Sequence, residues 1–169
     1  KYFRKLYRSR WVSTGISKGG TTAIIHRAFY PDDVDLTVSY VAPLNFARED
    51  ERLISFFDKV GTEEIRARIR DFQIEVLSRR DSIYPRFAAW ARANKVSFAM
   101  GPEAAFELAV LEYPFSFWQW CVPPASIPGK DASAKELYAA LYRGVDFRYF
   151  SRLEGDRMAP YFYQAYTQL

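Results

Sequence analysis

The spacing of apolar residues in the first quarter of the chain predicts a strand, a helix and a second strand. Residues 2–7 resemble the last turns of a basic helix, and residues 10–14 are short and β-prone. Residues 18–29 have apolar side chains at helical spacing, and a turn signal begins at Pro31. Residues 36–42 are again β-prone. We therefore expect a βαβ unit whose two parallel strands are joined by a right-handed crossover.

Beyond residue 43 the pattern predicts helices and no convincing strand. The expected helices cover 52–60, a stretch with Ile65, Ile69, Phe72 and Val76 on one face, 85–94, 102–113, and a stretch that opens with a capping box at 133–136 and ends at Gly144. Residues 114–129, rich in proline and aromatic residues, are expected to form an irregular loop. The chain thus divides into an α/β segment, 1–46, and a mostly helical insertion, 47–169.

Composition supports a folded chain that binds neither nucleic acid nor metal. Of the 169 residues, 49% are hydrophobic and 18% aromatic, which is ample surface to bury. The net charge of +4 is spread out, and the densest basic run, Arg66, Arg68 and Arg70, alternates with acids as on a solvated helix face. Cys121 and His26 are the only residues of their kinds, so we expect no internal disulfide, zinc site or cofactor.

Neither end of the sequence has the features of a complete chain. It begins without an initiator methionine or a signal peptide and ends within an aromatic, helical-looking stretch. No run of about 18 apolar residues occurs, so we expect no membrane span. We expect the sequence to be an internal segment of a longer protein.

The candidate catalytic residues lie at the turn between the first strand and the helix, where Gly15, Ser17 and Gly19 form a G-x-S-x-G motif. In this context the motif predicts a nucleophile elbow, a turn so tight that the backbone of the serine is strained. Gly15 and Gly19 would let strand and helix approach without a Cβ clash. The backbone N–H of Lys18, at the helix start, would point at a developing oxyanion.

Several stretches resemble the secreted prolyl tri- and tetrapeptidyl aminopeptidases of bacteria, which are related to Pro-X carboxypeptidase and dipeptidyl peptidase II. They are residues 11–23 (WVSTGISKGGTTA), 40–45 (YVAPLN), 49–52 (EDER), 60–62 (VGT) and 108–115 (LAVLEYPF). The resemblance implies a partial α/β-hydrolase sheet, with strand, nucleophile elbow, helix and strand, followed by a helical cap inserted after the second strand. It also implies a secreted, periplasmic or cell-surface location.

The segment is not expected to complete a catalytic triad. His26 lies nine residues beyond Ser17 on the same helix, or roughly 13 Å along its axis, too far for a hydrogen bond. Lys18 is a poor candidate for a Ser-Lys dyad. The residue after the nucleophile donates its backbone N–H to the oxyanion, and its side chain points away from that site. The resemblance implies that the acid and the histidine follow the cap, beyond Leu169, so the segment alone should be inactive.

Substrate-binding candidates are carboxylates and aromatic residues. An aminopeptidase must hold a free α-ammonium, for which Glu49, Asp50 and Glu112 are candidates. Flat aromatic faces suit a proline ring, which singles out Phe115, Phe117, Trp118 and Trp120. Each of these residues could instead be a surface carboxylate or part of the core of the cap.

The residues and the resemblance together predict a serine exopeptidase that acts through an acyl-enzyme on Ser17. Its partners would be peptides with a free amino terminus, from which it releases tri- or tetrapeptides with a preference for proline. One alternative is a carboxylic esterase or lipase on the same scaffold, which would have little use for paired carboxylates facing the serine. The other is a non-catalytic α/β-hydrolase relative that binds a partner through its cap.

Overall fold

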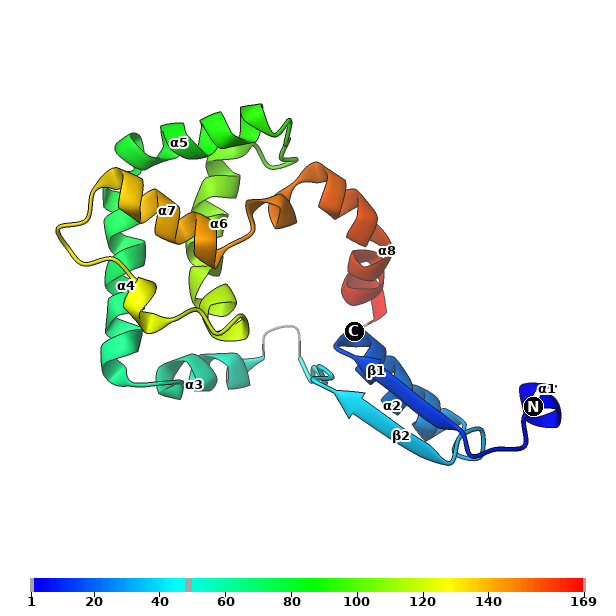
Figure 1. The fold of residues 1–169 in the computed structure, drawn as a ribbon. Coiled ribbons are helices and arrows are strands. Elements are labelled where there is room, and N and C mark those ends of the chain that lie inside the picture. Colours follow the sequence, from blue (N-terminus) through cyan, green and yellow to red (C-terminus); the bar gives the residue numbers. More distant parts are fainter. Residues whose placement is uncertain (1, 48–49, 169) are drawn as a thin grey trace. The chain divides into compact units, whose positions relative to one another are not determined.

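The computed structural model describes residues 2–47 and 50–168 and divides the chain into two compact units, Lys1–Asp50 and Glu51–Leu169 (Figure 1). No helix in the described ranges is long and apolar enough to cross a membrane. The domain boundary inferred from the sequence, between residues 46 and 47, falls in the segment that precedes the helical unit.

The first unit is the predicted βαβ arrangement. It consists of α1 (Tyr2–Leu6), β1 (Val12–Ile16), α2 (Lys18–Phe29) and β2 (Leu36–Tyr40). The two strands are parallel, and their register pairs Val12 with Leu36 and Ile16 with Tyr40. The prediction of parallel neighbours separated by a helix is confirmed. The small sheet is consistent with part of an α/β protein, and the α/β-hydrolase fold stays a prediction.

Helix α2 covers one face of this sheet. The Ser39 hydroxyl donates to the Gly20 carbonyl (3.0 Å), which ties β2 to the first turn of α2. On β1, residues alternate between exposed and half-buried, and the exposed ones are Val12, Thr14 and Ile16. The face opposite α2 therefore presents apolar side chains to the surroundings.

The second unit is helical. It contains α3 (Glu51–Lys59), α4 (Glu63–Ser78), α5 (Arg80–Ala93), α6 (Pro102–Gln119), α7 (Ala134–Gly144), α8 (Arg152–Gln168) and two short 3₁₀ helices, Pro124–Ser126 and Phe147–Phe150. The capping box at Ser133 and Glu136 is present, and Thr62 caps α4 by accepting from the N–H of Ile65. Helix α5 begins before Pro85, earlier than the sequence pattern indicates.

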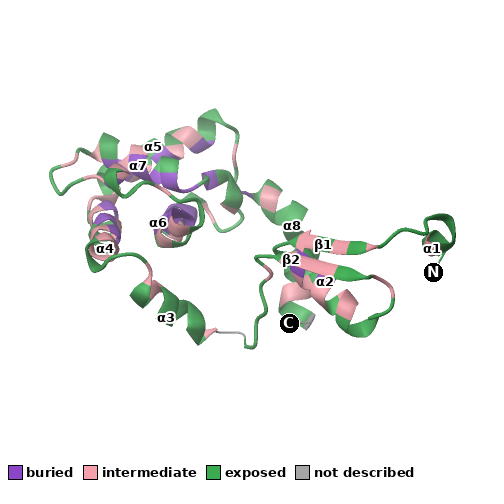
Figure 2. Cartoon of the chain, turned by 60° about the horizontal axis from the view of Figure 1, so that its bottom comes forward, coloured by how far each residue is buried: buried purple, intermediate pink, exposed green. Residues whose placement is uncertain are grey.

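Helices α4 to α7 enclose the core of this unit, which appears as the concentration of buried residues in Figure 2. Ile69, Phe72 and Val76 of α4 are buried on one face, as their spacing predicts. Aromatic rings fill the centre: Phe87 lies edge-on to Phe147 at 4.9 Å between ring centroids. Such edge-to-face pairs add to the stabilisation that burial of the rings provides.

The prediction that the helix beginning at residue 102 stops before Pro114 is wrong. Helix α6 continues through Pro114 to Gln119, so the first residues of the expected 114–129 loop are helical. A proline inside a helix leaves the carbonyl four residues earlier, here that of Val110, without its helical donor. The Gln73 side chain of α4 donates to this carbonyl at 2.8 Å. A neighbouring helix thus replaces the missing hydrogen bond.

The interpretation of the basic run as a solvated helix face is also wrong for two of its members. Arg66 and Arg68 are half-buried. Arg66 donates to the carbonyls of Val60 and Gly61, and Arg68 donates to the carbonyl of Ile127 at 2.9 Å. The long apolar stem of arginine lets its guanidinium reach such carbonyls from a packed helix. These side chains fix loops to α4.

Candidate active site

Ser17 has the backbone conformation that a nucleophile elbow requires. It stands between the last residue of β1 and the first of α2, with φ 55° and ψ −127°. These angles match the first central position of a type II′ turn, which glycine normally occupies. A side chain held there costs about 1–3 kcal/mol, and such strain is typical of functional positions. The motif therefore produces an unusual local geometry.

The tight turn depends on glycines at two positions. A Cβ on Gly15 would lie 2.2 Å from both the carbonyl carbon and the oxygen of Gly19, where no atom fits. A Cβ on Gly20 would lie 3.0 Å from that of Ala42. A Cβ on Gly19 would meet no atom within 4 Å among the described residues. The expected steric need thus holds at Gly15, whereas on the helix side it falls on Gly20 and not on Gly19.

Hydrogen bonds fix the elbow to the end of β2. The Ser17 N–H donates to the carbonyl of Tyr40 at 2.9 Å. The Thr21 hydroxyl donates to the carbonyl of Pro43 at 2.8 Å. Val41, directly after β2, has φ 44°, which is rare for a β-branched residue. The carboxyl ends of both strands therefore converge on the serine.

Ser17 and Lys18 stand at the start of α2, Ser17 as its N-cap and Lys18 as its first residue. The Ser17 side chain makes no capping hydrogen bond to α2. The first N–H groups of a helix have no acceptor within it, and together they form the positive end of the helix dipole. The role of the Lys18 N–H toward a developing oxyanion stays a prediction.

His26 occupies the far end of α2. Its Nε2 lies 3.7 Å from a carboxylate oxygen of Asp33, and its ring packs against Tyr30 at 5.5 Å between centroids. Since α2 runs unbroken from Lys18 to Phe29, the helical displacement of roughly 13 Å between Ser17 and His26 applies. Its neighbours give His26 a local structural role.

The three candidate carboxylates have different surroundings. Glu49 lies outside the described residues. Asp50 is half-buried in the segment before α3. Glu112 is half-buried on α6 and accepts a hydrogen bond from the Ser116 hydroxyl at 3.4 Å. Burial raises the pKa of the Glu112 carboxyl above its ordinary value, and the Ser116 hydroxyl partly opposes that rise.

The candidate aromatic residues separate into three environments. Phe117 is 1% exposed and belongs to the core, which is the second of the two alternatives that the sequence left open for it. Phe115 and Trp118 line a cavity of about 480 Å³ between α3, α4 and α6. Trp120 lines a second cavity of about 720 Å³, together with Glu112. Phe115, Phe117 and Trp118 lie on α6, and Trp120 directly follows it.

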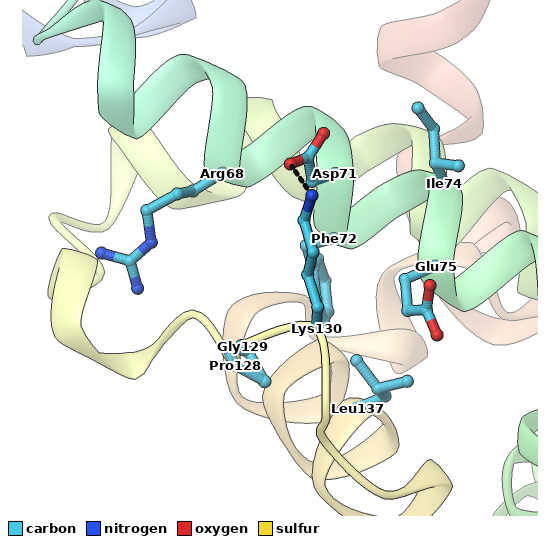
Figure 3. A pocket seen from close by; sticks show the side chains of 9 residues that line it. All are labelled: Arg68, Asp71, Phe72, Ile74, Glu75, Pro128, Gly129, Lys130 and Leu137. Atoms are coloured by element: carbon cyan, nitrogen blue, oxygen red, sulfur yellow. Dashed lines mark ion pairs between the residues drawn. The ribbon is translucent and has the colours of Figure 1, made fainter.

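A third cavity, of about 290 Å³, lies beside α4 (Figure 3). Its walls are Arg68, Asp71 and Glu75 of α4 and the loop that contains Lys130, with Phe72 and Leu137 also in the lining. Lys130 pairs with Asp71 at 3.8 Å, and its side chain is 88% exposed. An ion pair this exposed contributes little to stability. All the residues that line this cavity belong to the helical unit.

Two features of these sites were missed by sequence reasoning. Gly20 follows the motif directly, and its adjacency to Gly19 was the available signal. Arg143, near the end of α7, lines the same cavity as Glu112, and nothing in the local sequence brings the two together. Within the described residues, no group of three or more His, Cys, Asp or Glu side chains could hold a metal ion.

The model of the family described as PS-10 peptidase S37 matches residues 1–169. A prolyl tri/tetrapeptidyl aminopeptidase from Streptomyces mobaraensis is 39% identical over 171 residues, which cover 98% of this chain. The chain spans only 36% of the length of that relative. No solved structure matches the chain.

Proposed function

Because this chain belongs to the PS-10 peptidase S37 family, we propose that it supplies the nucleophile of a serine exopeptidase. The enzyme releases tri- or tetrapeptides, with a preference for proline, from peptides with a free amino terminus. The name of the Streptomyces relative supports this substrate class. An α/β-hydrolase fold for the whole catalytic domain, and a secreted or cell-surface location, belong to the same proposal.

The observation that carries the proposal is the backbone conformation of Ser17. A serine at φ 55° and ψ −127°, directly after a strand and before a helix, is strained in the way expected of a nucleophile elbow. A serine in an ordinary turn has no need of this conformation. Two features hold Ser17 in this conformation. The strand and the helix approach so closely at Gly15 that no side chain fits there, and the Ser17 N–H donates to the carbonyl of Tyr40.

In the proposed reaction, the Ser17 oxygen attacks the carbonyl carbon of the scissile bond while a base removes the hydroxyl proton. The N–H of Lys18 donates to the oxygen that becomes negative. Collapse of this tetrahedral species expels the amine and leaves the released peptide as an ester on Ser17, which water then hydrolyses. We expect the histidine base and its acid partner in the part of the protein beyond residue 169.

The cavity lined by Phe115 and Trp118 is the proposed site for a proline ring. Phe57 packs edge-on to Phe115 at 4.6 Å between centroids, and Trp118 lies over Gly61. These contacts hold the rings in place, and a rigid aromatic wall suits the flat, restrained pyrrolidine. The rim of this cavity carries charges of both signs, among them Asp58 and Arg70.

Labelling of the full-length protein with a fluorophosphonate tests the nucleophile. The probe should attach to Ser17, and Ser17→Ala should abolish both labelling and peptide turnover, with a loss of roughly 10⁴–10⁶-fold in rate. Ser78→Ala, a serine at the end of α4, serves as the matched control. Attachment to another serine, with Ser17→Ala still active, would refute the assignment. Turnover of simple esters without turnover of peptides would indicate an esterase.

A further inference from the structure

The cavity that contains Glu112 lies within the helical unit. It has a volume of about 720 Å³ and is lined by the second half of α6, the end of α7, the 3₁₀ helix Phe147–Phe150 and the start of α8. Ser116, one turn after Glu112, is 7% exposed and donates its hydroxyl to the Glu112 carboxylate at 3.4 Å. This wall therefore combines a buried hydroxyl with a half-buried carboxylate.

Most charges around this cavity are already paired. Asp146 receives two side-chain hydrogen bonds from Arg148, at 3.0 and 3.1 Å. Glu154 pairs with Arg157 at 2.8 Å. Among the described residues, neither Glu112 nor Arg143 makes an ion pair. One carboxylate and one guanidinium thus face the same cavity without compensating each other.

Such an arrangement fits a ligand that carries a cation and, a short distance away, a hydrogen-bond acceptor. A half-buried carboxylate without a cation is unfavourable, and an ammonium group from a ligand removes that cost. A guanidinium donates readily to a carbonyl oxygen. The amino terminus of a peptide presents both groups, because the carbonyl carbon of the first residue is bonded directly to the carbon that bears the ammonium.

We propose that this cavity binds the amino terminus of the peptide substrate, with Glu112 on the α-ammonium and Arg143 on the carbonyl of the first residue. Trp120 and Tyr149, 70% and 62% exposed, line the same cavity and provide faces for the first side chain. The inference rests on the proposed exopeptidase function. It selects one of the three candidate carboxylates and adds a partner that the sequence did not suggest.

The test measures kcat/KM of the full-length enzyme on two proline-containing tripeptide p-nitroanilides, one with a free amino terminus and one N-acetylated. Glu112→Gln should reduce the preference for the free amine about 10- to 100-fold, mainly through KM, because one charge-assisted contact is lost. Glu112→Asp, which keeps the charge, should retain part of the preference. Glu107→Gln is the matched control, since Glu107 is on the same helix but pairs with Arg80.

Arg143→Gln should behave differently. Both substrates keep the first carbonyl, so their KM values should rise together and the ratio between them should stay constant. Arg92→Gln, an exposed arginine of α5, is the control. Binding of the two peptides to the Ser17→Ala background, measured by calorimetry, gives the same comparison without turnover.

The outcomes separate this inference from the proposed function. If Ser17 reacts with the fluorophosphonate and peptides are cleaved, but folded Glu112→Gln keeps the parental preference, the amino terminus binds elsewhere and this inference is overturned. An Arg143→Gln variant that changes the ratio, or leaves both KM values unchanged, overturns the role of Arg143. If Ser17 does not react at all, the proposed function fails first.

Discussion

The two units differ in what they bury and in what strain they contain. The helical unit encloses a core with fully buried residues on several helices, such as Phe87, Phe106 and Leu141. In the described part of the α/β unit, only Gly20 and Ala23 are buried, both on α2. Yet Ser17 and Val41, at the end of the sheet, adopt costly backbone angles. Stability and candidate chemistry are thus assigned to different parts of the chain.

The comparison indicates how each unit should respond to change. A two-stranded sheet covered by one helix is too small to be stable alone, so the strained elbow must depend on packing beyond the described contacts. The helical unit has its own tightly packed core, so a substitution that disturbs this packing lowers the stability of the unit. Substitutions in the first unit should therefore affect catalysis first, and substitutions in the second should affect unfolding first.

The largest expected effect follows from Gly15→Ala. The new Cβ would stand 2.2 Å from the backbone of Gly19, so β1 and α2 must separate. A displacement of about 1 Å at the nucleophile costs roughly 100-fold in rate, and we expect at least that loss in kcat. Gly19→Ala, which meets no described atom, is the control and should retain far more activity. Equal losses in the two variants would contradict the assignment of the close approach to Gly15.

The next effect concerns the helical core. Phe87→Ala should lower the free energy of unfolding of residues 51–168 by about 3–5 kcal/mol, because a large buried ring is replaced by a cavity. Urea denaturation of this segment, followed by circular dichroism, measures the change. Leu111→Ala, at an exposed position of α6, should change it by less than about 0.5 kcal/mol. Similar losses in both variants would show that the core lacks the expected tight packing.

A smaller effect isolates the hydrogen bond that accommodates Pro114. Gln73→Leu leaves the Val110 carbonyl without its donor and should cost about 1–3 kcal/mol in unfolding free energy. In a Pro114→Ala background the new backbone N–H can donate to the same carbonyl, so the same substitution should cost less. A double-mutant cycle measures the coupling, and a coupling of zero would disprove the compensation.

The smallest expected effect is a pH dependence at Glu112. Burial raises the pKa of this carboxyl in the folded state, so folding disfavours its charged form. Stability contributed by this group is therefore present below the ordinary pKa of glutamate and lost as pH rises through the folded value. Glu112→Gln should melt at a slightly higher temperature than the parent near pH 7, and the difference should vanish near about pH 4. A lower melting temperature at pH 7 would contradict the cause given for the shift.

Local sequence was sufficient to predict the strand, turn and helix around Ser17, and insufficient to predict the helical unit in full. The motif, the preceding β-prone run and the following helix lie within a few residues of Ser17, so spacing alone predicted the strand, turn and helix. The continuation of α6 through Pro114 depends on Gln73, which is 37 residues earlier in the chain. The cavity that Glu112 shares with Arg143 likewise depends on how α6 and α7 pack. The spacing of apolar residues along the chain does not reveal partners that are so far apart in the sequence.

The angles at Ser17 also bear on how this position evolves. Glycine is the residue that suits φ 55° and ψ −127°, so a serine there reduces stability by an amount that Ser17→Gly should restore. Without selection for catalysis, selection for stability would favour the glycine. In descendants of this chain that have lost activity, we therefore expect Ser17, the proposed nucleophile, to be among the first residues replaced, with a gain in thermal tolerance.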